Sequence, residues 1–289
     1  MPRTLSPLRY PGGKTQLYDF VKHTIAINNL NHIIYCEPFS GGSGVAIALL
    51  LANDVENIIL NDFDIAIYSI WYAILNDADR FIDSIEAINI TIEEWNNQRN
   101  IYNRIINDNC QEYNFDLALS TFFLNRTNRA GIISGGPIGG YGQTSKYDLG
   151  CRFNKLDLIN KIENINRQRH RIALYNLDAI DLVNTILLNQ NPQNLFTYFD
   201  PPYYKQGQKL YKNSFNDNKH LQLAYAILQM DHFKWIATYD NEARIRNIYN
   251  NRIIYEYKLQ YSANKTRKET ELLFHSNNTV LEPYGPVSF

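Results

Sequence analysis

The stretch IIYCEPFSGGSG, residues 33–44, decides the fold class of this chain because it joins three local patterns in one order. Ile33–Cys36 is an apolar run typical of a buried strand, residues 41–44 are rich in glycine, and a helical segment begins near Val45. Glycine tolerates positive φ and lets a ligand approach the backbone closely. A strand, a glycine turn and a helix in this order are typical of an α/β sheet that binds a nucleoside.

The alternation of strand and helix continues along the chain. Segments of helical period lie between several of the strands, as in 45–52 and 220–230. Short β-branched and aromatic runs predict seven strands, at 33–36, 57–61, 171–175, 195–199, 234–239, 253–261 and 271–275. We therefore expect an α/β fold, a seven-stranded Rossmann-like sheet with helices on both faces.

Between about residues 63 and 166 the pattern changes to mostly helical. Residues 64–75, 93–106 and 115–125 have helical period, and Thr91 stands at capping-box spacing from Glu94. A glycine-rich stretch, 131–142, then predicts a loop or hairpin, followed by a polar segment to residue 152. We expect an inserted, mostly helical module at 63–166 and one α/β domain made of 1–62 and 167–289.

The charges are unevenly distributed, although the whole chain has a formal charge of −1. From Leu119 to Tyr175 there are nine lysine and arginine residues and three acidic ones, which gives +6 there and −7 elsewhere. A basic segment on an otherwise acidic protein is typical of a phosphate-binding surface. Solvated helix faces explain the charge count equally well.

Cysteine usage and hydropathy exclude several classes of protein. Cys36, Cys110 and Cys151 show neither metal-ligand spacing nor a disulfide framework. The longest strongly apolar stretch, 45–52, is too short to span a bilayer, and the first residues form no signal peptide. We expect a cytoplasmic protein without a membrane partner or a metal site.

The second predicted strand ends at Asn61-Asp62, where a carboxylate can accept hydrogen bonds from two ribose hydroxyls. The dinucleotide fingerprint is excluded because its third glycine position is occupied by Ile47. The run Gly12-Gly13-Lys14-Thr15 is no Walker A motif, since Leu8 stands where the first glycine is required. The spacing thus favours a nucleoside ligand over a dinucleotide or a nucleoside triphosphate, and a purely structural turn remains open.

The run LFTYFDPPYY, residues 195–204, places Asp200 at the carboxyl end of a buried strand, where open α/β sheets bind ligands. Pro201 and Pro202 fix φ and remove two backbone donors, so the loop is rigid and offers carbonyl acceptors. Tyr203 adds a flat face on which a base can stack. These groups suit methylation of an exocyclic amino nitrogen, which a carboxylate and a carbonyl activate by accepting its hydrogens. The alternative is a simple Pro-Pro turn after a strand.

With these motifs the chain closely resembles the Dam-type (D12 class) adenine-N6-specific DNA methyltransferases over almost its whole length. The matching segments are LRYPGGK (8–14), EPFSGGSG (37–44), Asn61-Asp62, Asn125-Arg126, Leu177-Asp178, DPPY (200–203) and NKTRKETELL (264–273). The resemblance implies a class I methyltransferase sheet with an inserted DNA-recognition domain. It also implies a cytoplasmic, site-specific enzyme that moves the methyl group of S-adenosyl-L-methionine to a flipped-out adenine in double-stranded DNA.

The resemblance also implies roles for single residues. Asp200, Pro201 and Tyr203 are expected to be catalytic. The cofactor is expected to contact Tyr10, Lys14, Phe39, Gly41, Gly42, Asp62, Asp178 and Asp200. Three of them have a structural alternative: Tyr10 as a core aromatic, Lys14 as a surface lysine, and Asp178 as the first residue of a helix.

DNA is expected to contact Asn125, Arg126, Asn128, Arg129, Lys265 and Arg267. Arginine reads guanine and asparagine reads adenine bidentately, although phosphate contacts or structural hydrogen bonds suit the same side chains. The glycine-rich loop at 131–152 is longer than the resemblance predicts, so the family's GATC target does not transfer to this chain. A separately encoded restriction endonuclease is a candidate partner, and we expect a monomer or a weak dimer.

Four other functions compete with this prediction. Methylation of cytosine N4 uses a similar acid or serine followed by Pro-Pro-aromatic, and only Asp200 and the resemblance favour adenine. Protein glutamine methyltransferases carry Asn-Pro-Pro-Tyr and lack the basic module. A non-catalytic DNA-binding regulator on a methyltransferase scaffold would not need the full set of expected catalytic residues. A dinucleotide-dependent oxidoreductase is disfavoured by the glycine spacing.

Overall fold

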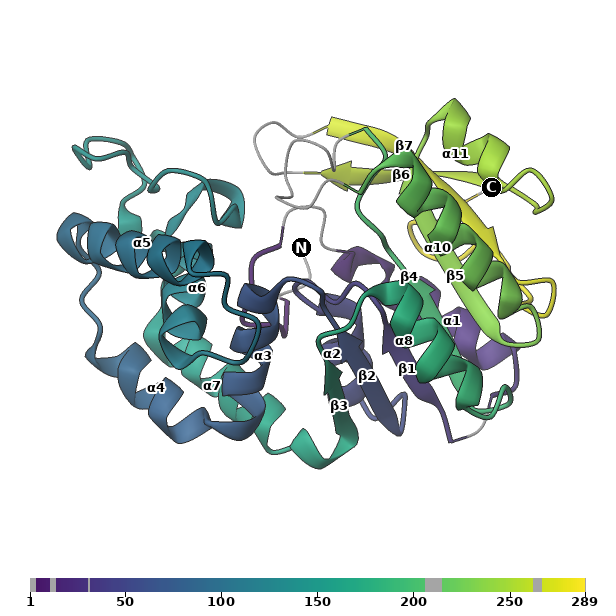
Figure 1. Ribbon diagram of the computed structural model, residues 1–289, viewed down its shortest axis with the longest axis horizontal. Coiled ribbons are helices and arrows are strands. Elements are labelled where there is room, and N and C mark those ends of the chain that lie inside the picture. Colours follow the sequence, from purple (N-terminus) through teal and green to yellow (C-terminus); the bar gives the residue numbers. More distant parts are fainter. Residues whose placement is uncertain (1–3, 11–13, 31, 206–214, 262–266, 289) are drawn as a thin grey trace.

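The computed structural model describes residues 4–10, 14–30, 32–205, 215–261 and 267–288. One twisted sheet forms the body of the protein, and a group of helices extends from one side of it (Figure 1). The sheet contains seven strands, namely β1 (Ile34–Glu37), β2 (Asn57–Asn61), β3 (Ile172–Tyr175), β4 (Leu195–Phe199), β5 (Lys234–Asp240), β6 (Tyr255–Tyr261) and β7 (Arg267–His275). All seven predicted strands are confirmed, with ends that differ by at most four residues.

The strand order is β3-β2-β1-β4-β5-β7-β6. The first five strands are parallel, whereas β7 runs antiparallel to both β5 and β6. The direction of the connections reverses between β1 and β4, which are paired from Ile34↔Leu195 to Cys36↔Thr197. Such a switch point opens a crevice at the carboxyl ends of the strands, and ligands bind there.

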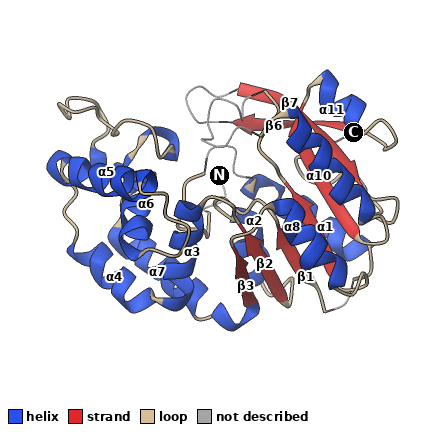
Figure 2. Cartoon of the chain, viewed as in Figure 1, coloured by secondary structure: helices blue, strands red, loops and turns tan. Residues whose placement is uncertain are grey.

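Helices cover both faces of the sheet, as predicted (Figure 2). Helices α1 (Tyr18–Ile27) and α2 (Gly44–Leu51) pack on one face, whereas α8 (Ala179–Thr185), α10 (Asp217–Gln229) and α11 (Ala243–Ile248) pack on the other. Successive residues of a strand face opposite sides, so Tyr198 joins the first core and Phe199 the second. None of the helices described here is both long and apolar enough to cross a membrane.

The insertion lies between β2 and β3 and consists of α3 (Ile65–Asn76), α4 (Ala78–Ala87), α5 (Ile92–Asn107), α6 (Phe115–Thr127) and α7 (Lys155–Asn166). The sequence did not predict α4 or α7. Thr91 caps α5 as expected, accepting a hydrogen bond from the Glu94 amide at 3.1 Å, but Gln98 donates to the Glu94 side chain. Phe122 and Leu158 of the insertion belong to the same buried cluster as Tyr35 of β1, so one core serves both regions.

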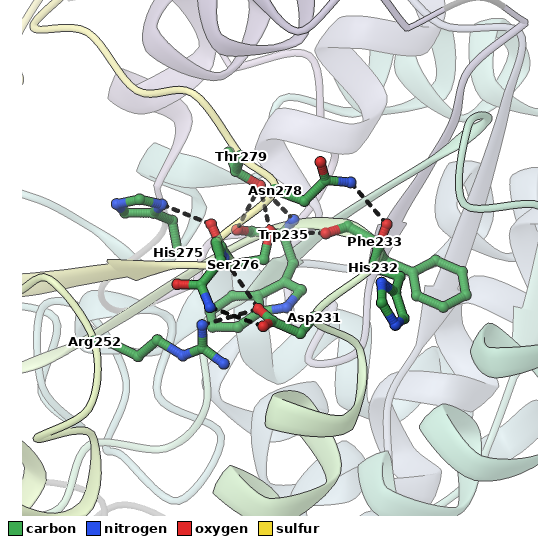
Figure 3. Close-up of polar contacts among 10 residues, drawn as sticks. Asp231, His232, Phe233, Trp235, Arg252, His275, Ser276, Asn278 and Thr279 are labelled. Carbon is green, nitrogen blue, oxygen red and sulfur yellow. Dashed lines mark hydrogen bonds and ion pairs between the residues drawn. The ribbon is translucent and has the colours of Figure 1, made fainter.

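A polar cluster joins the amino end of β5 to the carboxyl end of β7 (Figure 3). The Arg252 guanidinium donates to the Asp231 carboxylate at 2.8 Å, and Asn277 donates to it from both its backbone and its side chain. Ser276 Oγ donates to the Phe233 carbonyl at 2.7 Å, and the Trp235 amide donates to Thr279 Oγ1 at 3.0 Å. We call these residues the amino-end cluster; it ties the turn that follows β7 to the sheet.

Candidate active site

The loop after β4 places Asp200 beside a buried lysine from the amino-terminal segment. Lys14 Nζ lies 3.0 Å from Asp200 Oδ1 and 3.1 Å from Oδ2, and it donates to Tyr203 Oη at 2.7 Å. Only 6% of Lys14 is exposed, and its ammonium lies 4.8 Å from the centre of the Tyr203 ring. The alternative that Lys14 is a surface lysine is therefore excluded. The structure joins three of the predicted site residues, although they are almost 190 positions apart in the sequence.

A second carboxylate, that of the buried Glu271 of β7, completes this group. Tyr203 Oη donates a hydrogen bond to Glu271 Oε1, Tyr257 Oη donates to Oε2 at 2.5 Å, and Lys14 Nζ lies 3.8 Å from Oε1. Glu271 is only 1% exposed. We call Lys14, Asp200, Tyr203 and Glu271 the catalytic-end cluster. The sequence analysis gave Glu271 no role, although an acid in the apolar run ELLF was a detectable signal.

Asp200 also accepts a hydrogen bond from Thr238 of β5, at 2.9 Å to Oδ1. Because the Thr238 hydroxyl has one hydrogen and gives it to Asp200, the contact of 2.9 Å between Tyr198 Oη and Thr238 Oγ1 has Tyr198 as its donor. Burial raises the pKa of Asp200, and the Lys14 ammonium opposes this shift without cancelling it. The Asp200 carboxylate is therefore less well stabilised as an anion than an exposed aspartate.

Asp240, at the end of β5, fixes the backbone that follows the two prolines. Its carboxylate accepts hydrogen bonds from the amides of Tyr204 at 2.9 Å and Lys205 at 3.0 Å. Pro201 is buried at the start of the same loop. The loop is thus held at one end by β4 and at the other by the Asp240 side chain, which the sequence analysis did not identify.

The glycine turn after β1 lies at the neighbouring strand end. Gly41 has φ +46°, and a Cβ there would lie 2.8 Å from the Tyr10 ring, while a Cβ at Gly42 would lie 3.0 Å from Tyr10 Cβ. Trp71 of α3 donates to the Gly41 carbonyl at 3.0 Å. The positive φ and the close approach of Tyr10 therefore both favour glycine at position 41, whereas at position 42 only the approach of Tyr10 does. Tyr10 lies against the turn and is only partly buried.

Asp62 follows β2 and points back to the glycine turn. Its Oδ2 accepts from the Gly41 amide at 2.7 Å and its Oδ1 accepts from the Asp64 amide at 3.0 Å. Desolvation, together with the Asp64 charge, raises the pKa of Asp62 to about 7. Two carboxylate oxygens have about four acceptor positions, so lone pairs remain for hydroxyl groups of a ligand.

The remaining predicted cofactor residues, Phe39 and Asp178, lie further along the same edge of the sheet. Phe39 is partly buried and meets Phe215 edge-on, with ring centres 6.1 Å apart. Asp178 caps α8 by accepting from the Ile180 amide at 3.0 Å, and its Oδ2 pairs with Lys219 at 3.0 Å. Asp178 also lines an open surface depression of about 440 Å³ that runs between α8 and α10. The alternative that Asp178 begins a helix is thus realised.

Three of the six predicted DNA-binding residues are buried in the interior of the insertion. Asn125 donates to the carbonyls of Arg9 and Gly131, and Asn128 accepts from the Trp95 indole at 2.7 Å and donates to two carbonyls. Arg126 is 8% exposed, donates to the carbonyls of Arg152 and Pro7, and has its pKa lowered to about 10 by burial. These side chains hold backbone together, and the geometry gives their predicted base contacts no support.

The other three differ in position. Arg129 is exposed on the segment that follows α6. Lys265 lies outside the described residues, and Arg267 begins β7 with a side chain that is not described. Of the basic segment, Lys155 and Arg171 donate to backbone carbonyls and Lys161 pairs with Asp157. The basic segment therefore offers fewer side chains to a phosphate than its charge count suggests. Arg129, Lys146 and Arg152 are exposed and are among those that it does offer.

Among the described residues, no group of three or more histidine, cysteine, aspartate or glutamate side chains is arranged to hold a metal ion.

A sequence model of the D12 class N6 adenine-specific DNA methyltransferases matches residues 10–263. The type II methyltransferase M.MjaIII of Methanocaldococcus jannaschii is 23% identical over 240 residues, which are 78% of this chain and 79% of that protein. Two structures of the rRNA methyltransferase aviRa from Streptomyces viridochromogenes are similar to this one, and each match covers 93% of this chain and 87% or 88% of the aviRa chain. They are 10% and 12% identical to this chain, each with a TM-score of 0.39.

Proposed function

Because the chain belongs to the D12 class of N6 adenine-specific DNA methyltransferases, we propose that it methylates adenine N6 at a specific site in double-stranded DNA, with the chemistry at Asp200. The observation that carries this proposal is the position of Asp200. Its partly buried carboxylate, with a raised pKa, lies at the carboxyl end of β4 beside the switch point of the sheet.

The catalytic loop suits the weak nucleophilicity of an exocyclic amino group, whose lone pair is delocalised into the ring. Asp200 accepts one N–H hydrogen of the amino group, and a main-chain carbonyl of the Asp200-Pro201-Pro202 turn accepts the other. Both acceptors favour a pyramidal nitrogen and stabilise the positive charge that develops as the nitrogen attacks a methyl carbon. The nitrogen loses one proton when the new N–C bond is complete, and the raised pKa of Asp200 suits it as the acceptor of that proton.

The residues at the glycine turn fit S-adenosylmethionine. Asp62 has acceptor positions left for ribose hydroxyls, and Gly41, Gly42 and the partly buried Tyr10 form a compact wall beside it. Lys14, Phe39 and Asp178 belong to the same edge of the sheet. When bound, this cofactor supplies a methyl group made electrophilic by a sulfonium. The residues of the chain orient the acceptor nitrogen and exclude water.

DNA recognition is assigned in this proposal to the insertion, residues 63–166, and catalysis to the remaining domain, 1–62 and 167–289. The exposed arginines 129 and 152 and Lys146 are the described candidates for phosphate or base contacts, joined by Lys265 and Arg267. A base inside a duplex cannot reach Asp200, so it must leave the stack, and Tyr203 offers a face for it. A separately encoded restriction endonuclease remains a candidate partner.

The test is to express the protein in a host free of DNA methylation and to sequence the genome for modified bases. We expect N6-methyladenine at one short recurrent motif, and no modification with Asp200→Ala as the matched control. N4-methylcytosine in its place would reject the choice of base. A folded wild-type protein that modifies no DNA, together with no transfer from labelled cofactor to genomic DNA in vitro, would reject the function.

A further inference from the structure

The geometry points to Glu271 as the positioning residue of the catalytic loop, acting through Tyr203 and Lys14 rather than on the reacting atoms. This inference rests on the proposed function, because it concerns how Asp200 and Tyr203 are held for methyl transfer.

The direction of each hydrogen bond follows from the donors available. An ammonium can only donate, so the bond of 2.7 Å from Lys14 to Tyr203 Oη occupies an acceptor position of the phenol. The single hydrogen of the phenol is then directed to Glu271 Oε1. Tyr203 is thereby fixed between a cation and an anion, and its ring has one orientation in which both bonds are made.

The anchor of this chain of bonds is rigid. Glu271 lies in the middle of β7, paired with Asp240 of β5 on one side and Tyr257 of β6 on the other. Tyr203, in contrast, belongs to a loop outside any strand. A buried carboxylate on a strand that is paired on both sides is therefore placed to set the position of a loop residue. Glu271 also lies 3.8 Å from the Lys14 ammonium, which in turn contacts Asp200.

A purely structural role would explain why Glu271 is buried, but it would not explain why its two oxygens have partners in different parts of the fold. Tyr257 donates to Oε2 from the neighbouring strand β6, where it is the cross-strand partner of Glu271, so this bond links β6 to β7. The bonds at Oε1 lead to the catalytic loop. Tyr257→Phe is therefore a matched control, since it removes one phenol hydroxyl from the same carboxylate on the side away from the loop.

The experiment uses the full chain with Glu271→Gln, Tyr257→Phe, Tyr203→Phe and the double variant Glu271→Gln/Tyr203→Phe. Single-turnover methyl transfer is measured on a duplex that contains the target site. We expect Glu271→Gln to lower the rate about 10- to 100-fold with KM values for DNA and cofactor changed less than about threefold, because a small misplacement costs about 10²-fold. Tyr257→Phe is expected to lose less than about threefold. The rate of methyl transfer by the double variant is expected to lie within about twofold of the rate of the slower single variant, because both substitutions break the same chain of bonds.

A readout other than activity is the emission of 2-aminopurine placed at the target base, which reports stacking in the pocket. We expect Glu271→Gln and Tyr203→Phe to change it in the same direction, and Tyr257→Phe to leave it unchanged. Multiplicative rate losses in the double variant, a wild-type rate for Glu271→Gln, or an equal loss in Tyr257→Phe would each overturn the inference. A wild-type protein without adenine methylation would instead overturn the proposed function, so the two failures are distinct.

Discussion

Strands β5 and β7 carry a polar cluster at each end, and the two clusters are built differently. At the amino end, Arg252 pairs with Asp231, and the surrounding bonds go to turn backbone and to side chains near the end of the chain. At the catalytic end, one lysine faces two carboxylates and a phenol, and these four side chains come from three separate segments. The first arrangement closes the fold, whereas the second concentrates charge where the sheet receives a ligand.

The two aspartates show this difference in their acidity. Burial tends to raise the pKa of Asp231, but the Asn277 amide and the Arg252 guanidinium outweigh it, so the pKa is lowered. Burial also raises the pKa of Asp200, and there Lys14 and Thr238 do not outweigh it. The surroundings of Asp231 thus favour its ionised form, whereas those of Asp200 favour the protonated form, so a further hydrogen-bond donor would stabilise the Asp200 carboxylate. Geometry alone would not have separated them, since both make ion pairs of 2.8–3.0 Å.

Asp200→Ala tests the comparison most directly and has the largest expected effect. We expect methyl transfer to fall by at least about 10³-fold, since the variant loses the acceptor that stabilises the developing charge. DNA affinity should stay within about threefold, because a carboxylate is repelled by phosphate and does not bind it. The measurements are single-turnover transfer and DNA titration, and undiminished transfer would reject the mechanism.

Arg126→Ala extends the comparison into the insertion. The variant leaves the Arg152 and Pro7 carbonyls without their buried donor, so we expect the free energy of unfolding to fall by about 3 kcal/mol. The exposed Arg129 is the matched control. Arg129→Ala should keep its stability, weaken DNA binding about 3- to 10-fold and reduce the salt dependence of binding. A stable Arg126→Ala protein with altered site choice would restore the prediction that Arg126 reads a base.

Asp231→Ala should separate stability from activity at the amino-end cluster. The Arg252 side chain is only 6% exposed and would lose its carboxylate partner, so we expect a loss of about 2 kcal/mol in unfolding free energy. Because the pKa of Asp231 is lowered in the folded protein, this contribution is present above its unfolded pKa and disappears as the pH falls through the folded value. Chemical unfolding at several pH values measures it, and a rate of methyl transfer changed more than about threefold would contradict the assignment.

Glu37→Gln comes last because its effect is expected only as a pH dependence. Burial raises the pKa of Glu37, beneath the first turn of α2, to about 8. An acid with a raised pKa contributes stability at low pH that is lost as the pH rises from its unfolded value through its folded one. Relative to the variant, the wild-type protein should therefore lose about 2 kcal/mol between pH 6 and 8. Parallel pH profiles for the two proteins would contradict this.

Much of the fold was predictable from sequence because its signals are local. Buried parallel strands such as Leu195–Phe199 are continuous apolar runs, and the turn at Gly41 needs residues without a Cβ. Helices α4 and α7 were missed although their buried residues lie at helical spacing, Phe81 and Ile85 in α4 and Leu158, Ile162 and Ile165 in α7. Their amphipathic patterns were local signals that the prediction did not use.

The site was predictable only in part. Asp200, Asp62 and the glycines follow strands, so topology brings them to one edge of the sheet. Glu271 and Asp240 reach the catalytic loop through the antiparallel pairing of β5 and β7, which no motif spacing encodes. Asn125, Arg126 and Asn128 have donors that suit bases, but donor chemistry does not indicate whether a side chain points outward.

The single core that joins the insertion to the sheet limits how a new target sequence can be acquired. A chimera cut at residues 63 and 166 would have to supply α3 and α7 with apolar faces shaped for a foreign sheet, because Ile70 and Ile162 pack in the same cluster as Leu60 and Val45. Such a transplant costs cavities or clashes in the interior. Under the proposed role of the insertion in DNA recognition, the exposed positions between residues 129 and 152 are therefore the ones to vary, with the helical framework left unchanged.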